Sequence, residues 1–386
     1  MRIGLLGIQC DNPNLGVEAL AYSILRITSD LVPGDFVVFS ADSRSALART
    51  AKIIGLEETR LVSAPIRHRR LADLHGTLRI MRSCDLIIDL TGGDSFADIY
   101  GVRRLMVNLI DKLLALWSGR PLVIAPQTIG PFRQRLFLPV VRHVLNKAAL
   151  VFTRDELSRD AAASLTRREV VVATDVALAL PFDRGKPGLG APSAVRVGLN
   201  VSGLLWNGGY TKDNQFGLQT DYRVYCSELV ERLLSEGLEV HLVPHVVGRE
   251  GGLEEDDVMA CEEVVASHPR CISAPRFDNP VDAKSYIANL DVMIGSRMHA
   301  TIAAFTSGVA TIPVAYSRKF AGYYSNLGYP DLVDLTKLNT SAAVASTVRL
   351  VDDRLRLSLA ARDCQDVAAA KLQEFTSRLA DLLSGL

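Results

Sequence analysis

One short stretch late in the chain combines residue types suited to binding an anion and to moving a proton. Gly295 and Ser296 follow an apolar run that ends a predicted strand, and Arg297 and His299 stand where a helix is expected to begin. At such a junction, backbone N–H groups and the helix dipole favour an anion. Arginine adds a planar, two-pronged donor for phosphate or carboxylate, and histidine can transfer a proton near neutral pH. The ordinary alternative is a helix-capping histidine and an arginine in a surface ion pair.

Polar side chains follow several other predicted strands. In the first half they include Gln127, which we expect to project into a cleft, and Arg154, which stands at a helix start where the dipole favours acids over a cation. In the second half they include His245 and Lys319. Because the carboxyl ends of parallel strands face the same edge of a sheet, we expect these residues to form a locally cationic cleft that attracts an anion.

Two polar turns in the first half could hold neutral hydroxyl groups. Asn14 and Glu18 open a helix after the first strand, and a glycine between them would let a ligand approach closely. Ordinary helix capping explains the same residues equally well. Asp94 and Asp98 follow a pair of glycines whose N–H groups could point at a ligand. A tight turn is the alternative explanation there.

Length and composition exclude several classes of protein. The chain has 386 residues, of which 48% are hydrophobic, and this fits two domains of roughly 150–200 residues. Lys and Arg together number 43, as do Asp and Glu, so the zero net charge argues against nucleic acid as the main partner. The first residues do not resemble a signal peptide, and no run of about 18 apolar residues predicts a membrane span. The six scattered cysteines lack the spacing of a metal site, so we expect buried thiols in a reducing cytoplasm, and no metal.

Short apolar runs alternate with helical segments along both halves. Such runs are typical of strands buried on both faces of a parallel sheet, so we predict an α/β fold with two Rossmann-like domains and a cleft between them. A segment rich in Gly and Pro at 183–194 is the expected linker between an N-terminal domain at 1–182 and a C-terminal domain at 195–386. Residues 340–383 are expected to be helical and to close the chain. We expect strands at Arg2–Ile8, Asp35–Ser40, Asp85–Leu90, Pro121–Ala125, Leu150–Thr153 and Val170–Ala173, and then at Val195–Val201, Glu239–Pro244, Ile272–Ser273, Asp291–Ile294 and Ala310–Ala315.

The ordered set of turns resembles the polysaccharide pyruvyl transferase family over about residues 3–335. Val17 stands where we expect an acidic residue. The resemblance implies two domains similar to glycosyltransferases of the GT-B type. The matching segments are Asn14–Ala19, Asp89–Phe96, Pro126–Phe132, Thr153–Asp155, Thr174–Leu178, Pro244–Gly248, Gly295–Ala300 and Tyr316–Gly322.

The resemblance also implies a reaction, with phosphoenolpyruvate as the donor and a pyruvate ketal bridging two sugar hydroxyls as the product. Arg297 and His299 match the family's R-x-H site, with His299 as the general acid, and Arg154 matches a second donor-binding arginine. No other cofactor is implied. The remaining expected donor-binding residues are Lys319, His245, Ser296 and Gln127, and the expected acceptor-binding residues are Asn14, Glu18, Asp94 and Asp98.

Two other functions remain compatible with the sequence. One is a nucleotide-sugar glycosyltransferase or epimerase with the same two-domain plan, and the other is a non-catalytic protein that binds glycans or phosphorylated ligands. The acceptor is a sugar or glycan of unspecified type. Peripheral association with a membrane and assembly into a homo-oligomer both remain open.

Overall fold

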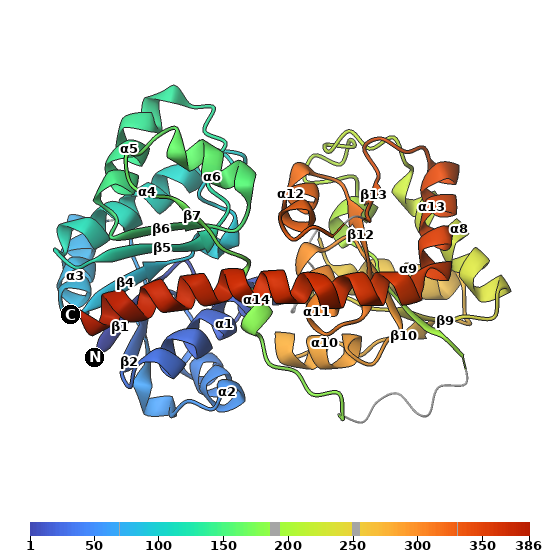
Figure 1. Ribbon diagram of the computed structural model, residues 1–386, viewed down its shortest axis with the longest axis horizontal. Coiled ribbons are helices and arrows are strands. Elements are labelled where there is room, and N and C mark those ends of the chain that lie inside the picture. Colours follow the sequence, from blue (N-terminus) through green and yellow to red (C-terminus); the bar gives the residue numbers. More distant parts are fainter. Residues whose placement is uncertain (69, 186–193, 249–254, 330) are drawn as a thin grey trace. The chain divides into compact units, whose positions relative to one another are not determined.

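The computed structural model of the chain describes residues 1–68, 70–185, 194–248, 255–329 and 331–386 (Figure 1). The expected linker at 183–194 falls mainly outside these residues. The chain forms two compact units. Unit 1 comprises Met1–Asn12, Leu20–Leu180 and Ala368–Leu386, and unit 2 comprises Pro13–Ala19 and Pro181–Val367.

Unit 1 is built on a seven-stranded parallel sheet in the order β3-β2-β1-β4-β5-β6-β7. Its central strands are continuous apolar runs with every residue buried or nearly so, as a sheet covered on both faces requires. Strand β3, which the sequence did not indicate, pairs with β2 at the edge. The strands are β1 (Arg2–Leu6), β2 (Asp35–Val38), β3 (Leu61–Ser63), β4 (Leu86–Asp89), β5 (Leu122–Gln127), β6 (Leu150–Thr153) and β7 (Val171–Val172).

Helices of unit 1 cover its sheet, and the side chains that pack on one another form one large apolar core. Helices α3, α4 and α5 lie next to one another and contribute Met81, Leu109 and Val144 to that core. Helix α2 begins at the side-chain cap of Ser43 and ends at Gly55, whose left-handed backbone (φ 75°) closes the last turn. The helices are α1 (Leu15–Leu31), α2 (Arg44–Ile54), α3 (Leu71–Arg82), α4 (Val102–Trp117), α5 (Leu138–Lys147) and α6 (Glu156–Ala163), with short 3₁₀ turns at Glu58–Arg60, Thr91–Gly93, Arg135–Phe137 and Val176–Ala179.

Unit 2 is built on a six-stranded parallel sheet in the order β10-β9-β8-β11-β12-β13. Helices α10 and α11 pack on one another and share an apolar cluster that includes Ala283, Met293 and Ala304, and α13 packs on α8. The strands are β8 (Arg196–Asn200), β9 (Glu239–Leu242), β10 (Ile272–Ser273), β11 (Val292–Gly295), β12 (Ala310–Ala315) and β13 (Val333–Asp334). The helices are α7 (Gly203–Trp206), α8 (Tyr222–Ser235), α9 (Asp257–Ser267), α10 (Pro280–Ile287), α11 (Met298–Thr306), α12 (Arg318–Asn326), α13 (Thr340–Asp352) and α14 (Arg354–Ser384).

The order of strands reverses once in each sheet, between β1 and β4 in unit 1 and between β8 and β11 in unit 2. Ligands of open α/β sheets bind at the carboxyl ends of the strands on either side of such a reversal. The fold therefore singles out the turns after β8 and β11, which include the R-x-H stretch, and the turns after β1 and β4.

Two helices contribute residues to both units. The first turn of α1 belongs to unit 2 and the rest of the helix to unit 1, and α14 passes from unit 2 to unit 1 at Ala368. Within unit 1, Phe375 packs edge-on against Phe152 at 5.0 Å, and Arg378 forms an ion pair with Glu169 at 2.7 Å. The sequence division at 182 and 195 does not include these two exchanges.

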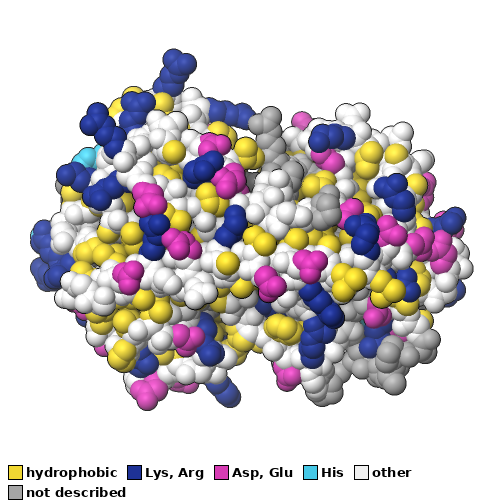
Figure 2. All heavy atoms as spheres, in the orientation of Figure 1, with side chains coloured by type: hydrophobic (Ala, Val, Ile, Leu, Met, Phe, Trp, Pro, Cys, Tyr) yellow, Lys and Arg dark blue, Asp and Glu magenta, His cyan; other side chains and the backbone are white. Residues whose placement is uncertain are grey.

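The sequence-derived picture of an α/β protein with two parallel sheets and a closing helical segment is confirmed. All six cysteines are buried free thiols. Within the described residues, no helix has the length and apolar character needed to cross a bilayer. On the face drawn in Figure 2, basic and acidic side chains are intermixed, in keeping with a net charge of zero.

Candidate functional site

The turn between β11 and α11 is fixed by hydrogen bonds to the neighbouring strand β8 and to helix α8. The Arg297 N–H donates to the side-chain oxygen of Asn200, which ends β8, at 2.8 Å. The Tyr222 hydroxyl donates to Ser296 Oγ at 2.9 Å and accepts the N–H of Ser202 at 2.9 Å. Gly295 is needed here because a Cβ would lie 2.6 Å from the Thr301 side chain. The R-x-H stretch therefore begins from a rigid strand end.

The Arg297 side chain lies inside unit 2 and is held by acids. Its Nε and Nη2 atoms donate to Asp257 at 3.1 and 2.9 Å, and Nη1 donates to Glu255 at 3.0 Å. Burial alone would lower the guanidinium pKa, but Asp257, the Tyr316 hydroxyl and Glu255 outweigh burial and raise it. Arg297 is thus a permanent cation whose charge is largely matched by its own neighbours.

Asp257 connects three strand ends and was not singled out by the sequence. Its carboxylate is fully buried and accepts from the two guanidinium nitrogens of Arg297, from the Asn200 amide, and from the N–H groups of Gly203, His245 and Val246. In the sequence it closes an acidic run at the start of a helix, which is typical of a solvated first turn. A buried carboxylate with this many donors fixes their positions.

His245 is a buried, neutral imidazole at the end of the β9 segment. It is only 2% exposed, and within the described residues neither ring nitrogen has a hydrogen-bond partner. Burial, together with the charges of the nearby His299 and Arg297, lowers its pKa to about 3. His245, His299 and Arg297 therefore lie near one another in unit 2.

His299 lies in the first turn of α11 and against the first turn of α1. A Cβ on Gly16 would be only 2.6 Å from Cγ of the His299 ring. The α1 segment is anchored beside it, because the Leu15 N–H donates to the His245 carbonyl at 3.1 Å and the Val247 N–H donates to the Pro13 carbonyl at 2.8 Å. We expected Gly16 to let a ligand approach closely, but the space beside its Cα is taken by the ring of His299, the candidate catalytic residue.

Asn14 and Glu18, expected on the acceptor side, belong to this same unit 2 cluster of elements. Asn14 Oδ1 accepts the Gly16 N–H at 3.0 Å, so it shapes the turn that receives His299. Glu18 is fully buried in the first turn of α1. Lys319 lies in α12, and its side chain is outside the described part of the structure.

Arg154 is the corresponding cation of unit 1, and it is also buried. Its Nη1 pairs with Asp175 at 2.8 Å, and its Nε donates to Thr128 at 3.0 Å. Burial opposes the charge, but Asp175, Asp94 and Asp155 outweigh burial and raise the guanidinium pKa. Arg154 precedes Asp155, whose side chain caps α6, so its own position is outside the helix.

Gln127 does not project into a cleft. Strand β5 extends two residues beyond the predicted end, so Gln127 becomes its last residue and is fully buried. Its amide nitrogen donates to the carbonyl and carboxylate of Asp89 at 2.9 and 3.1 Å. The same carboxylate receives Lys112 at 3.1 Å, and the Lys112 ammonium, itself fully buried, donates to Thr91 at 2.6 Å. Gln127 is part of an interior polar network.

The glycine pair after β4 does not offer its N–H groups to a ligand. Gly92 donates to the Gly7 carbonyl at 2.6 Å, and Gly93 donates to the Leu90 carbonyl at 2.8 Å. Asp98 is likewise engaged, because its carboxylate accepts the N–H groups of Arg133 and Gln134.

Asp94 lies near Arg154, because its charge helps to raise the pKa of the Arg154 guanidinium. Its carboxylate also accepts a hydrogen bond from the Tyr100 hydroxyl at 2.6 Å. The structure therefore gives Asp98 a loop-bracing contact, and it places Asp94 beside Arg154.

Within the described residues, carboxylates accompany both buried arginines of the expected cationic cleft. Arg154 faces Asp175, Asp94 and Asp155, and Arg297 faces Asp257 and Glu255. Asp155 is the next residue after Arg154, and Asp94 was itself a predicted site residue. Asp175, Asp257 and Glu255 come from segments that the sequence did not place beside these cations. Within the described residues, no group of three or more His, Cys, Asp or Glu side chains has the arrangement of a metal site.

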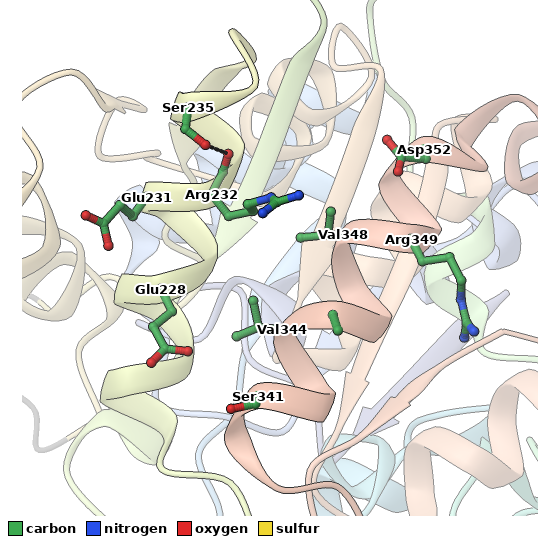
Figure 3. A pocket seen from close by; sticks show the side chains of 10 residues that line it. Glu228, Glu231, Arg232, Ser235, Ser341, Val344, Val348, Arg349 and Asp352 are labelled. Atoms are coloured by element: carbon green, nitrogen blue, oxygen red, sulfur yellow. Dashed lines mark hydrogen bonds between the residues drawn. The ribbon is translucent and has the colours of Figure 1, made fainter.

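A separate groove of about 620 Å³ lies between α8 and α13 (Figure 3). Arg232, Val344 and Val348 face the space between the helices, whereas Glu231 and Arg349 point away from it. Its lining residues come from helix surfaces and not from strand ends. The chemistry suggested by the sequence is therefore not located in this groove.

Comparison with solved structures shows the GT-B-like fold. The structure is similar to Alr3699/HepE of Anabaena in complex with UDP and glucose, with a TM-score of 0.60 and 15% identity over 100% of both chains. It is also similar to a putative UDP-N-acetylglucosamine 2-epimerase from Listeria monocytogenes, with a TM-score of 0.58 and 12% identity over 97% of this chain and 96% of the other.

Sequence comparison shows the family. The chain is 21% identical over 309 residues to the amylovoran biosynthesis protein AmsJ of Erwinia amylovora, covering 76% of this chain and 70% of AmsJ. The profile described as polysaccharide pyruvyl transferase matches residues 14–318. These residues include both the first turn of α1 and the R-x-H stretch that it touches. The chain belongs to the polysaccharide pyruvyl transferase family and is a transferase of polysaccharide biosynthesis.

Proposed function

We propose that the protein transfers the pyruvyl group of phosphoenolpyruvate to two hydroxyl groups of one sugar in a glycan or glycan precursor, forming a ketal and releasing phosphate. Family membership supports the pyruvyl group. The observation that carries the proposal is the placement of His299, which is held between the strand end of β11 and the first turn of α1, beside neutral His245. A single positioned proton donor is what the first step of this reaction requires.

His299 protonates the methylene carbon of the enol ester, and C2 becomes oxocarbenium-like. The first sugar hydroxyl forms a C–O bond to C2, the bond from C2 to the phosphate oxygen breaks, and the second hydroxyl closes the ketal. The two hydroxyl protons replace the proton taken from His299 and protonate the departing phosphate, so the reaction balances without an oxidant. General acid catalysis of this kind contributes about 10²–10⁴-fold in rate.

His245 and Arg297 set the surroundings of that proton donor. A neutral His245 does not repel a proton on its neighbour, as a second imidazolium would. Arg297 fixes the turn through Asp257 and gives the site a permanent positive charge. Ser296, whose hydroxyl accepts from Tyr222, completes the turn.

The remaining predicted roles stay proposals. Lys319 would bind the phosphate of the donor, since Arg154 and Arg297 are each paired with carboxylates. Arg154 would contribute to donor binding with Asp94 beside it. Asn14 and Glu18 would orient the acceptor, because they lie on the turn that touches His299.

The test is phosphate release from phosphoenolpyruvate in the presence of candidate glycan acceptors, with mass spectrometry of the product. We expect release that depends on the acceptor and a product heavier by one carboxyethylidene group. Thermal shifts with phosphoenolpyruvate and with UDP-sugars separate the alternatives, because a ligand that binds the folded state stabilises it. Stabilisation by UDP-sugars alone, or no turnover with any glycan acceptor, would contradict the proposal.

A further inference from the structure

The segment after β8 forms a loop of fixed shape beside the R-x-H turn. Lys212 and Asn214 adopt left-handed backbone conformations (φ 62° and 58°), which non-glycine residues rarely do. The Asn214 side chain closes the loop by donating to the Leu218 carbonyl at 2.9 Å and accepting the Leu218 N–H at 2.8 Å. The Gln219 N–H then ties the loop to the Leu335 carbonyl at 2.9 Å. Strained backbone of this kind persists where its surroundings impose it, commonly at ligand sites.

This loop and the start of α8 enclose a pocket of about 350 Å³, which is within the range of small-ligand sites. Its walls include three aromatic side chains and an aliphatic one, and an amide and a carboxylate are among its polar groups. These lining residues are Trp206, Phe216, Leu218, Gln219, Asp221 and Tyr222.

Two contacts join the pocket to the candidate site. Tyr222 lines the pocket, and its hydroxyl donates to Ser296 in the R-x-H turn at 2.9 Å. Phe216 packs edge-on against Tyr316 at 4.8 Å, and the Tyr316 hydroxyl acts electrostatically on Arg297. The pocket is therefore adjacent to the proposed reaction centre within unit 2.

The charges of the pocket do not suit the anionic donor. Among the described residues that line it, Arg223 is the cation, and it lies over the Trp206 ring at 4.7 Å and pairs with Glu263 at 3.3 Å. Asp221 adds a negative charge and caps α8. Gln219 lines the pocket and is exposed, so its amide can serve a ligand. Aromatic faces with an amide and a carboxylate fit a neutral, hydroxyl-bearing ring.

We propose that this pocket binds a sugar ring of the acceptor glycan, next to the ring that receives the pyruvyl group. The inference rests on the proposed function, because only that function makes the glycan an acceptor. It assigns recognition of the acceptor to the β8–α8 loop in addition to the turn at Asn14 and Glu18. The ring would lie against Trp206 or Phe216 and exchange hydrogen bonds with Gln219 and Asp221.

Saturation-transfer NMR with the methyl glycosides of glucose, galactose and mannose tests the pocket without any turnover. We expect at least one glycoside to bind the unmodified protein, and binding to weaken about tenfold in Gln219→Ala, as the loss of one or two hydrogen bonds predicts. Gln219 is exposed, so this variant keeps its fold. Trp206→Ala is the second variant. Glu231→Ala, at an exposed position of α8 that does not line the pocket, is the matched control and should leave binding unchanged.

The results also separate this inference from the proposed reaction. In His299→Asn, glycoside binding should persist although turnover is lost. If phosphoenolpyruvate proves not to be the donor, the proposed function fails while the binding data still report on the pocket. Absence of binding by all three glycosides, or equal binding by the unmodified protein, Gln219→Ala and Trp206→Ala, would overturn the inference.

Discussion

The order of strands reverses at equivalent places in the two sheets, but the polar groups at the two reversals have different hydrogen-bond partners. After β1 and β4 in unit 1, the backbone closes on itself, because the Gly7 carbonyl accepts the Gly92 N–H and Lys112 fills the space beneath with its ammonium on Asp89. In unit 2, the backbone near the ends of β8 and β9 is held by Asp257, whose carboxylate accepts the N–H groups of Gly203 and His245.

The two reversals differ in which polar groups are already used by contacts within the protein. In unit 1 the polar groups of the reversal are used by one another. In unit 2 the interior contacts of Asp257 hold Arg297 and the His245 backbone, while His299 is only partly buried on the first turn of α1. An equivalent position in a repeated architecture therefore predicts where a site can form, and the side chains that satisfy the strand ends decide whether it does.

The largest effect should come from breaking the unit 1 network. Lys112→Met leaves the buried Asp89 carboxylate without its cation, and we expect the free energy of unfolding to fall by about 3–5 kcal/mol. Chemical denaturation measures it. The matched control is Arg26→Met, which removes an exposed pair with Asp30 (side chains 44% and 60% exposed) and should cost about 0–1 kcal/mol. Equal losses in the two variants would mean that the network is not structural.

Next in size is the displacement of His299 by a single methyl group. Gly16→Ala places a Cβ against the imidazole, and a misplaced catalytic group costs about 10²-fold in rate. Turnover of phosphoenolpyruvate is the measurement. Gly76→Ala is the control, because a Cβ there meets nothing within 4 Å in helix α3, and the change should stabilise the protein by about 0.5–1 kcal/mol. Full activity in Gly16→Ala would separate His299 from the reaction.

The positions of most strands, though not of the edge strands β3 and β13, and of the R-x-H stretch could be predicted from the sequence because both signals are local. Apolar runs predict buried strands, and a strand followed by a polar turn and a helix predicts a binding edge. Gln127 was misplaced because two further residues joined β5, and Asp257 was missed because its partners come from three distant segments. Lys112, in the middle of a helix, gave no sign that it reaches a carboxylate under the β4 turn.

A smaller effect on stability and rate should follow from replacing the guanidinium group of Arg297. Arg297→Lys keeps the charge but cannot maintain the two bonds to Asp257 together with the one to Glu255. We expect a loss of about 1.5–3 kcal/mol in unfolding free energy and a lower kcat. Stopped assays on the folded protein measure the second quantity. Arg26→Lys, at an exposed pair, is the control. An Arg297→Lys variant with unchanged stability would show that the fork is not required.

The effect that is smallest at neutral pH comes from the titration of His245. The folded-state pKa of His245, about 3, lies below the unfolded value near 6.5, so its contribution to stability is complete above pH 6.5 and declines as the pH falls toward 3. His245→Gln should remove up to about 1.4 kcal/mol per pH unit from the slope in that window. Parallel denaturation curves at several pH values give the difference. Identical slopes would mean that His245 takes up its proton without unfolding the protein.

The central claim is that His299 delivers the proton. The direct measurement compares phosphate release and phosphoenolpyruvate affinity in His299→Asn, with His143→Asn at an exposed position as the control. We predict that phosphate release falls by about 10²–10⁴-fold while the donor still binds, and that the control behaves like the unmodified protein. Phosphate release at the unmodified rate in His299→Asn would contradict the account.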